Sequence, residues 1–280
     1  MSTNVQNEPH QGWRGGLKRA QAVEKNQLVL KAFIVLNCFK SSDEWVTGGE
    51  LSRRANLPQA SGYRLIHTLE RIGAVIRGPQ GRFRPGMLLV ALSRKVEIGE
   101  LLRKSSEKIV CELAKTFNLT VHIGILEEGM VTYVSKASTP GAFPINTRVG
   151  AQLEAYSSAL GKVLLASLSR EQLDSIILDG DLVPLTEHTI TNPTELRAEL
   201  NKVRKQRFAM DDRESNMETI CISVPIVDID GRVIAAMSAS DHAANMTIPR
   251  QREILSALWS AVQEVERKVC PSRLTSAALV

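Results

Sequence analysis

The chain has 280 residues, 43% of them hydrophobic, which is enough for a sizeable core and suggests about two domains. It contains no apolar run of about 18 residues that could span a bilayer, and its polar first residues lack the charged-then-apolar pattern of a signal peptide. We therefore expect a globular cytoplasmic protein without a membrane partner. The four cysteines are scattered without a C-x-x-C pair, which predicts neither a disulfide framework nor a cysteine-rich zinc site.

The charge is distributed unevenly along the chain. Residues 1–93 hold 13 Lys and Arg against 6 Asp and Glu, a net charge of +7, whereas the whole chain carries only +5. The remainder is therefore close to neutral, at −2. A basic first third joined to a near-neutral remainder is typical of a nucleic-acid-binding module attached to a different kind of domain, although a merely basic surface would give the same count.

The first third begins with a polar stretch, residues 1–25, that we predict to be a flexible basic arm. A helix is expected to follow from Asn26, with an apolar face formed by Leu28, Ala32, Val35, Leu36 and Phe39. Thr47 is predicted to cap a short second helix, with Glu50 as its reciprocal capping-box partner. Pro58 fits the first turn of a third helix that extends to Ile72.

The third helix and the hairpin after it carry the candidate DNA contacts. At about 100° per residue, Leu65, Leu69 and Ile72 share the buried side of the helix, and a polar face lies opposite. The segment from Arg77 to Gly81 contains Gly and Pro and is expected to form a turn between two short strands, which makes a wing. Side chains of the polar face would enter the major groove, and the wing would meet the backbone of the DNA. The predicted DNA-binding residues are Gln59, Ala60, Ser61, Tyr63, Arg64, His67, Arg77, Arg82 and Arg84.

Three segments resemble the IclR (isocitrate lyase regulator) family of bacterial transcription factors. The stretch GGELSRRANLPQASGYRLIHTLERIGAVIRGPQGRFRPG resembles its DNA-binding domain, and AYSSALGKVLLASL resembles the helix after its sensor loop. The segment RFAMDDRESNMETICISVPIVDIDGRVIAAMSAS resembles its C-terminal signature, and the likeness runs from about residue 26 to 268. One residue departs from the pattern, because the family usually has glycine at the position of Glu218, which we expect to affect the pocket rim or the loop before the strand.

The resemblance implies an α+β protein with an N-terminal winged helix-turn-helix, a linker helix and a C-terminal GAF/profilin-like α/β sensor domain. The predicted divisions are a winged helix-turn-helix over 26–86, one linker helix over 87–105, an effector-binding domain over 106–270 and a flexible tail over 271–280. Two hairpins, turning at 127–129 and at 228–231, and four later helices predict a sheet flanked by helices. The resemblance also implies a homodimer or a dimer of dimers that binds double-stranded operator DNA.

The effector site is placed by the same resemblance together with local chemistry. A helix expected from Ser158 offers free N–H groups that suit a carboxylate, and Gly161 would allow close approach of the backbone. Ser238 and Ser240 lie two apart, so they project from one face of a strand. The predicted effector-binding residues are Ala159, Leu160, Gly161, Asp211, Cys221, Ser238 and Ser240. Each also has a structural explanation, since a cysteine is often buried, a serine can satisfy backbone and an aspartate can cap a turn.

We interpret the chain as a transcriptional regulator whose effector is a small organic acid, either a keto or an aromatic acid. The resemblance implies that it represses a catabolic operon. An enzyme is not expected, because Cys221 as a nucleophile needs a base and the sequence does not place His122 near it. The histidines and acids lack metal-ligand spacing, so neither a metal nor another cofactor is predicted. The alternative is a redox sensor that acts through Cys221 or Cys111.

Overall fold

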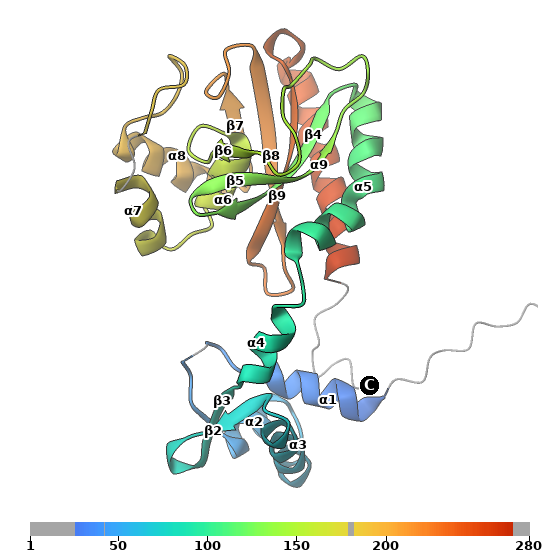
Figure 1. Ribbon diagram of the computed structural model, residues 1–280, viewed down its shortest axis with the longest axis vertical. Helices are drawn as coiled ribbons and strands as arrows, with labels where there is room; N and C mark the ends of the chain where they lie inside the picture. Colours follow the sequence, from blue (N-terminus) through green and yellow to red (C-terminus); the bar gives the residue numbers. More distant parts are fainter. Residues whose placement is uncertain (1–25, 42, 179–181, 271–280) are drawn as a thin grey trace, which may run out of the picture. The chain divides into compact units, whose positions relative to one another are not determined.

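A computed structural model describes residues 26–41, 43–178 and 182–270, and the chain forms two compact units that divide between Pro85 and Gly86 (Figure 1). The predicted arm, 1–25, and tail, 271–280, lie outside the described residues. Each unit is described by itself below.

In its described residues, the first unit combines three helices with a small antiparallel sheet of order β1-β3-β2. Its elements are α1 (Gln27–Leu36), β1 (Val46–Thr47), α2 (Gly48–Arg54), α3 (Gln59–Arg71), β2 (Val75–Arg77), a 3-10 turn (Pro79–Gly81) and β3 (Arg82–Pro85). Asn26 and Thr47 cap α1 and α2 by accepting hydrogen bonds from backbone N–H groups, as their side chains favour. The helix-turn-helix and wing therefore form where the sequence predicts them.

Two apolar positions of the first unit differ from the prediction. Leu28 in α1 is 66% exposed and Ile72 after α3 is 53% exposed, although both were expected in the core. The core instead takes Ile34 and Val35 from α1, with Phe83 of the wing. Helical spacing shows which apolar residues share a face of the helix, but it does not show how wide the buried part of that face is. An apolar residue at the edge of the face can therefore be exposed.

The second unit begins with two helices, which corrects the single linker helix predicted over 87–105. These are α4 (Met87–Ser93) and α5 (Ile98–Phe117), and Glu97 between them has an extended backbone. α4 buries none of its residues, whereas α5 buries Leu102 and several later positions. Helices in proteins are stabilised mainly by packing against the rest of the fold. The helix is therefore interrupted between α4, which is not buried, and α5, which packs against the sheet.

A six-stranded antiparallel sheet of order β6-β5-β4-β9-β8-β7 forms the centre of this unit. Its strands are β4 (Thr120–Glu127), β5 (Met130–Ala137), β6 (Gln152–Glu154), β7 (Ala209–Asp212), β8 (Thr219–Val227) and β9 (Val233–His242). Both predicted hairpins, β4-β5 and β8-β9, are present. Asp211, which was expected before the strand of Cys221, lies in a strand of its own and pairs with Cys221.

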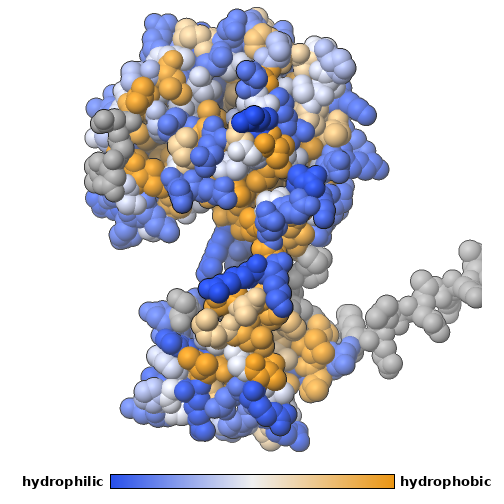
Figure 2. Space-filling model, viewed as in Figure 1, coloured by the Kyte–Doolittle hydropathy of each residue, from blue (hydrophilic) through white to orange (hydrophobic). Residues whose placement is uncertain are grey.

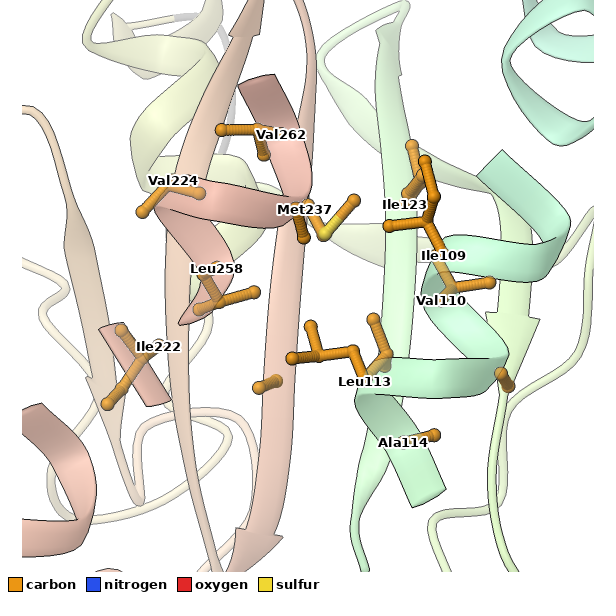
Figure 3. Packing of buried hydrophobic residues seen from close by; sticks show 14 of the residues in the cluster. Ile109, Val110, Leu113, Ala114, Ile123, Ile222, Val224, Met237, Leu258 and Val262 are labelled. Atoms are coloured by element: carbon orange, nitrogen blue, oxygen red, sulfur yellow. The ribbon is translucent and has the colours of Figure 1, made fainter. Parts of the chain in front are cut away.

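Helices cover both faces of the sheet (Figure 1). They are α6 (Ala159–Leu165), α7 (Arg170–Leu178), α8 (Pro193–Gln206) and α9 (Ile248–Val269), with a short 3-10 helix at Ala243–Asn245. α5 and α9 pack on one face, where Val110, Leu113 and Leu258 meet strand residues such as Ile123 and Met237 (Figure 3). α6 and α8 pack on the other face. The alternation of side chains therefore gives β4, β8 and β9 one apolar face, and their second face carries the polar residues discussed below.

Candidate DNA-binding face and effector cavity

α3 presents the predicted recognition residues on one side. Leu65 and Ile66 fix the helix in the core, and Gly62 is buried against Ser52 of α2. The predicted contacts then face outward: Gln59, Ala60, Tyr63, Arg64 and His67 are exposed, and Ser61 is half-buried. Within the described part of the chain, the Arg64 guanidinium forms no ion pair, so it is available to a phosphate or a base edge.

The wing carries two cation–π contacts that the sequence did not predict. The Arg84 guanidinium lies 4.8 Å from the Trp45 ring centre, and the Arg77 guanidinium lies 5.8 Å from that of Phe83. Trp45 also packs on Gly78, where an added Cβ would come within 2.2 Å of the indole. Of the three wing arginines, Arg84 is half-buried. Trp45, directly before β1, was the signal that could have indicated an aromatic partner for the wing arginines.

An ion-pair network holds α2, the helix that precedes α3. Arg54 bonds Glu44 and Glu50 and donates to the carbonyl of Cys38 at 3.0 Å. Hydrogen bonds from Arg53 and Arg54 lower the pKa of Glu50 to about 2. Glu50 therefore serves this network, which corrects its predicted role as capping-box partner of Thr47; only the Thr47 half of that motif forms.

A cavity of about 260 Å³ lies between the polar face of the sheet and the start of α6. Strand register builds its floor: Asp211, Cys221 and Ser240 are cross-strand neighbours on β7, β8 and β9, and Ser238 is paired with His122 of β4. Residues that are directly opposite each other in antiparallel strands project from the same face of the sheet. These five side chains from four strands therefore line the same cavity. Ser238 and Ser240 both line it, as their spacing predicts.

Burial and hydrogen bonding change the pKa values of Asp211 and Cys221 in the floor of the cavity. Asp211 is fully buried, and its carboxylate accepts bonds from the N–H groups of Glu214 and Ser215 and from the Ser215 hydroxyl. Burial raises the pKa of Asp211, and the same desolvation, with Asp211 alongside, raises the pKa of the Cys221 thiol. Cys221 is consequently a protonated thiol, a poor nucleophile that is slow to oxidise. Asp211 orders its own turn and also lines the cavity.

His122, Tyr133 and Thr147 are cavity residues that the predicted site did not include. The His122 Nε2 lies 2.7 Å from the Thr147 hydroxyl, and its ring packs 4.6 Å from that of Tyr133. Burial, with Lys136 nearby, lowers the pKa of His122 to about 3, so the imidazole is neutral. The wall that contains Thr147 comes from the loop after β5, and no sequence pattern places this loop over the sheet.

The start of α6 forms the opposite wall. Ala159 and Leu160 line the cavity, and the Ser158 hydroxyl caps the helix by accepting from the Gly161 N–H at 3.1 Å. Gly161 is not a lining residue: an added Cβ would meet the Ala155 carbonyl oxygen at 2.0 Å. This corrects its expected role, because the close approach that glycine allows is to the chain's own backbone rather than to an effector.

A buried ion pair lies on the same helix. The Lys162 Nζ donates to Glu214 Oε1 at 2.5 Å, and both side chains are almost completely buried. Glu214 follows Asp211 in the turn that Asp211 orders, so the pair ties α6 to the end of β7. Glu218, the residue found where the family usually has glycine, is exposed and lines the same cavity at its mouth.

These features define a class of protein, a winged helix-turn-helix joined to a sheet domain with a small cavity lined by polar residues. Residues 28–79 match the IclR helix-turn-helix domain, and residues 99–267 match the domain described as Bacterial transcriptional regulator IclR C-terminal. The chain belongs to the IclR family, and it is a DNA-binding transcriptional regulator with a C-terminal effector-binding domain. The α+β, two-domain prediction is confirmed.

Known proteins resemble the chain over most of its length. The HTH-type transcriptional regulator KdgR of Escherichia coli K12 is 28% identical over 242 residues, 86% of this chain and 92% of KdgR. The crystal structure of Thermotoga maritima IclR has a TM-score of 0.58 and 28% identity, covering 86% of this chain and 98% of that one. An IclR homologue of Microbacterium hydrocarbonoxydans, complexed with 4-hydroxybenzoate, has a TM-score of 0.57 at 24% identity, covering 86% and 98%, and it supports the fold alone.

The family also bears on the rival interpretations. Its regulators are not enzymes, in agreement with the prediction, and nothing in the comparisons supports the redox alternative through Cys221 or Cys111. Within the described residues, no three His, Cys, Asp or Glu side chains group as metal ligands, and no helix is both long and apolar enough to cross a membrane.

Proposed function

We propose that this regulator represses a catabolic operon and that a small organic acid, a keto or an aromatic acid, alters its binding to operator DNA. The observation that carries this proposal is the cavity, because polar groups from four strands face a helix start across a space of about 260 Å³. That volume is below the range of about 300–1,000 Å³ typical of drug-sized ligands, so it favours a metabolite.

The proposed effector binds through its carboxylate to backbone N–H groups near Ala159 and Leu160 and to the hydroxyls of Ser238 and Ser240. The first N–H groups of a helix have no intrahelical acceptor, so they are free to donate to an anion. Both serine side chains are buried, at 2% and 4% exposure, so a hydrogen bond to either forms away from water. Asp211 accepts a hydroxyl or a bridging water of the effector, because two carboxylates would repel each other.

On the DNA side, we propose that α3 enters the major groove. Gln59, Tyr63, Arg64 and His67 then face bases or phosphates with Ala60 and Ser61, and Arg77, Arg82 and Arg84 of the wing lie along the backbone. A second copy of the chain is the proposed partner, as dimer or dimer of dimers. Its support is exposed apolar surface on α1 and α4, and hydrophobic patches are visible on the surface in Figure 2. On α1, Leu28, Val29 and Phe33 are each more than half exposed.

The test is a titration of organic acids into the full-length protein. Ser240→Ala removes one hydrogen bond to a charged ligand, so affinity should fall by about 1.5–3 kcal/mol, or roughly tenfold to a hundredfold. Ser256→Ala, on the exposed surface of α9, is the matched control and should change nothing. Calorimetry measures the effector, and gel shifts measure the operator, which both variants should bind normally. Unchanged effector affinity in Ser240→Ala and Ser238→Ala would move the site elsewhere.

A further inference from the structure

The mouth of the cavity carries an acidic side chain without a partner. Glu218 is exposed and lines the cavity, and in the described part of the chain its carboxylate has neither an ion pair nor a hydrogen bond. Its backbone is held independently of the side chain: the N–H donates to Asn216 Oδ1 at 2.8 Å, and the carbonyl accepts from the Ala243 N–H at 2.7 Å. The backbone of Glu218 is therefore held in place, whereas its carboxylate oxygens are available to a ligand.

No cation balances this charge inside the cavity. Among the described lining residues the charged ones are Asp211 and Glu218, both acidic, and none is Lys or Arg. Two lysines of this unit close to the cavity are bonded to other groups: the Lys136 Nζ, on a half-buried side chain, donates to the carbonyls of Ile145 and Thr147, and the buried Lys162 is paired with Glu214. A ligand at the mouth therefore meets the Glu218 carboxylate with no lysine or arginine among the described lining side chains to pair with it.

The two ends of the cavity consequently favour different chemistry. At the inner end, Ala159, Leu160, Ser238 and Ser240 are all at least 96% buried and offer backbone or hydroxyl donors. At the mouth, Glu218 offers only acceptor oxygens. An effector with its carboxylate inside places its other end beside Glu218, so that end gains by donating a hydrogen bond or carrying positive charge. A second carboxylate there would be repelled.

We propose that Glu218 sets the effector class of this regulator: small monocarboxylic acids whose far end bears a hydroxyl or an amino group, with dicarboxylic acids rejected. This inference rests on the proposed function. Glu218 acts as a specificity-determining residue, since discrimination is a difference between two affinities and a repulsive element can supply it. The backbone of Glu218 is not left-handed, so other side chains fit this position without strain.

The experiment compares matched acids that differ only at the far end. Two sets serve as probes: 4-(aminomethyl)benzoate, 4-hydroxybenzoate and terephthalate, and 5-aminopentanoate, 5-hydroxypentanoate and glutarate. Each is titrated by calorimetry into the full-length protein, into Glu218→Gln, which keeps the size and removes the charge, and into Glu253→Gln. The last is a control on the exposed surface of α9, outside the cavity.

In the parent, affinity should fall from amino to hydroxy to carboxylate within each set that binds. In Glu218→Gln, the ratio of affinities for the amino-substituted acid and the dicarboxylic acid should fall by about threefold to tenfold. This is the size expected for one charge pair at a partly hydrated cavity mouth. Glu253→Gln should keep the parent ratios. A ratio unchanged in Glu218→Gln would overturn the inference while leaving the effector site intact. Absence of binding by every acid to parent and variants would instead overturn the proposed function, and the inference with it.

Discussion

The DNA-binding unit and the effector-binding unit use polar side chains in opposite ways. On α3 and the wing, Arg64 and Arg82 are exposed and carry charges that the described chain leaves unpaired. In the cavity, Ser238 and Ser240 are buried and neutral, and Asp211 already accepts three hydrogen bonds from its own turn. DNA is a polyanion that is met in water, whereas a small effector is bound where water has been removed.

This difference predicts how substitutions in each unit affect ligand binding and folding. A surface charge can be lost with little effect on folding, because solvent already screens it. A buried group contributes to binding and to the fold together, because its neighbours are packed around it. The following substitutions are ordered from the largest expected effect to the smallest, and each asks whether the contrast holds.

Gly161→Ala should destabilise the effector-binding unit by about 3 kcal/mol or more, because the new Cβ would overlap the backbone of Ala155 at 2.0 Å. Gly49→Ala, in α2 of the other unit, is the control, since its Cβ would meet Gln59 Nε2 at 3.9 Å, an ordinary contact. The control should be neutral or stabilising by up to about 1 kcal/mol. Denaturant unfolding measures both, and equal stabilities would show that the α6 contact is not rigid.

Arg64→Ala should weaken specific operator binding by roughly 1–3 kcal/mol if this side chain reads a base edge. Arg82→Ala should weaken binding to all sequences alike and reduce the salt dependence, as expected for a phosphate contact. Gel-shift titrations at several salt concentrations distinguish the two, with Arg252→Ala on α9 as the control. If both variants bind operator as tightly as the parent, the proposed docking of α3 and the wing is wrong.

Acidification should destabilise the effector-binding unit through His122. Its pKa is about 3 when folded, against about 6.5 in an unfolded chain, so on acidification the unfolded state takes up the proton first. The stabilisation is complete above pH 6.5 and is lost as the pH falls toward 3, by about 2 kcal/mol between pH 7 and pH 5. Unfolding at several pH values should show a shallower dependence in His122→Gln, and the exposed His188→Gln should keep the parent's. Identical slopes in all three would contradict this account.

The smallest effect is expected in the wing, where Trp45 supports Arg84. A double-mutant cycle of Trp45→Leu and Arg84→Ala should give a coupling of about 0.5–1 kcal/mol in the free energy of unfolding, the value of an accessible cation–π contact. Trp45→Leu should also weaken operator binding, because the wing loses its platform. A coupling free energy of zero would mean that the contact between Trp45 and Arg84 does not contribute to stability.

Sequence alone predicted the elements that carry local signals. The turns at Glu127–Gly129 and Asp228–Gly231 marked two hairpins, and Thr47 marked the start of α2, because turn and cap chemistry depends on a few adjacent residues. The break between α4 and α5 carried no such signal, since it depends on which residues find a packing surface. The short strands β1, β6 and β7 were missed for a similar reason, because they exist through pairing with distant segments.

The site divides in the same way. Ser238 and Ser240 follow from strand periodicity, and both line the cavity. His122 and Thr147 join it through cross-strand pairing and the path of a loop, which one sequence does not reveal. Gly161 was assigned to the effector although it packs against Ala155, because glycine indicates a close approach without indicating to what.

The register of the sheet has a consequence for how such regulators diverge. Asp211, Cys221 and Ser240 stand in a row because backbone hydrogen bonds align β7, β8 and β9, and those bonds do not depend on the identity of the side chains. A single mutation can therefore change what the row recognises while the row itself stays in place. The chemical groups that a metabolite meets in this row can accordingly change by single substitutions without a change in the pairing of the strands.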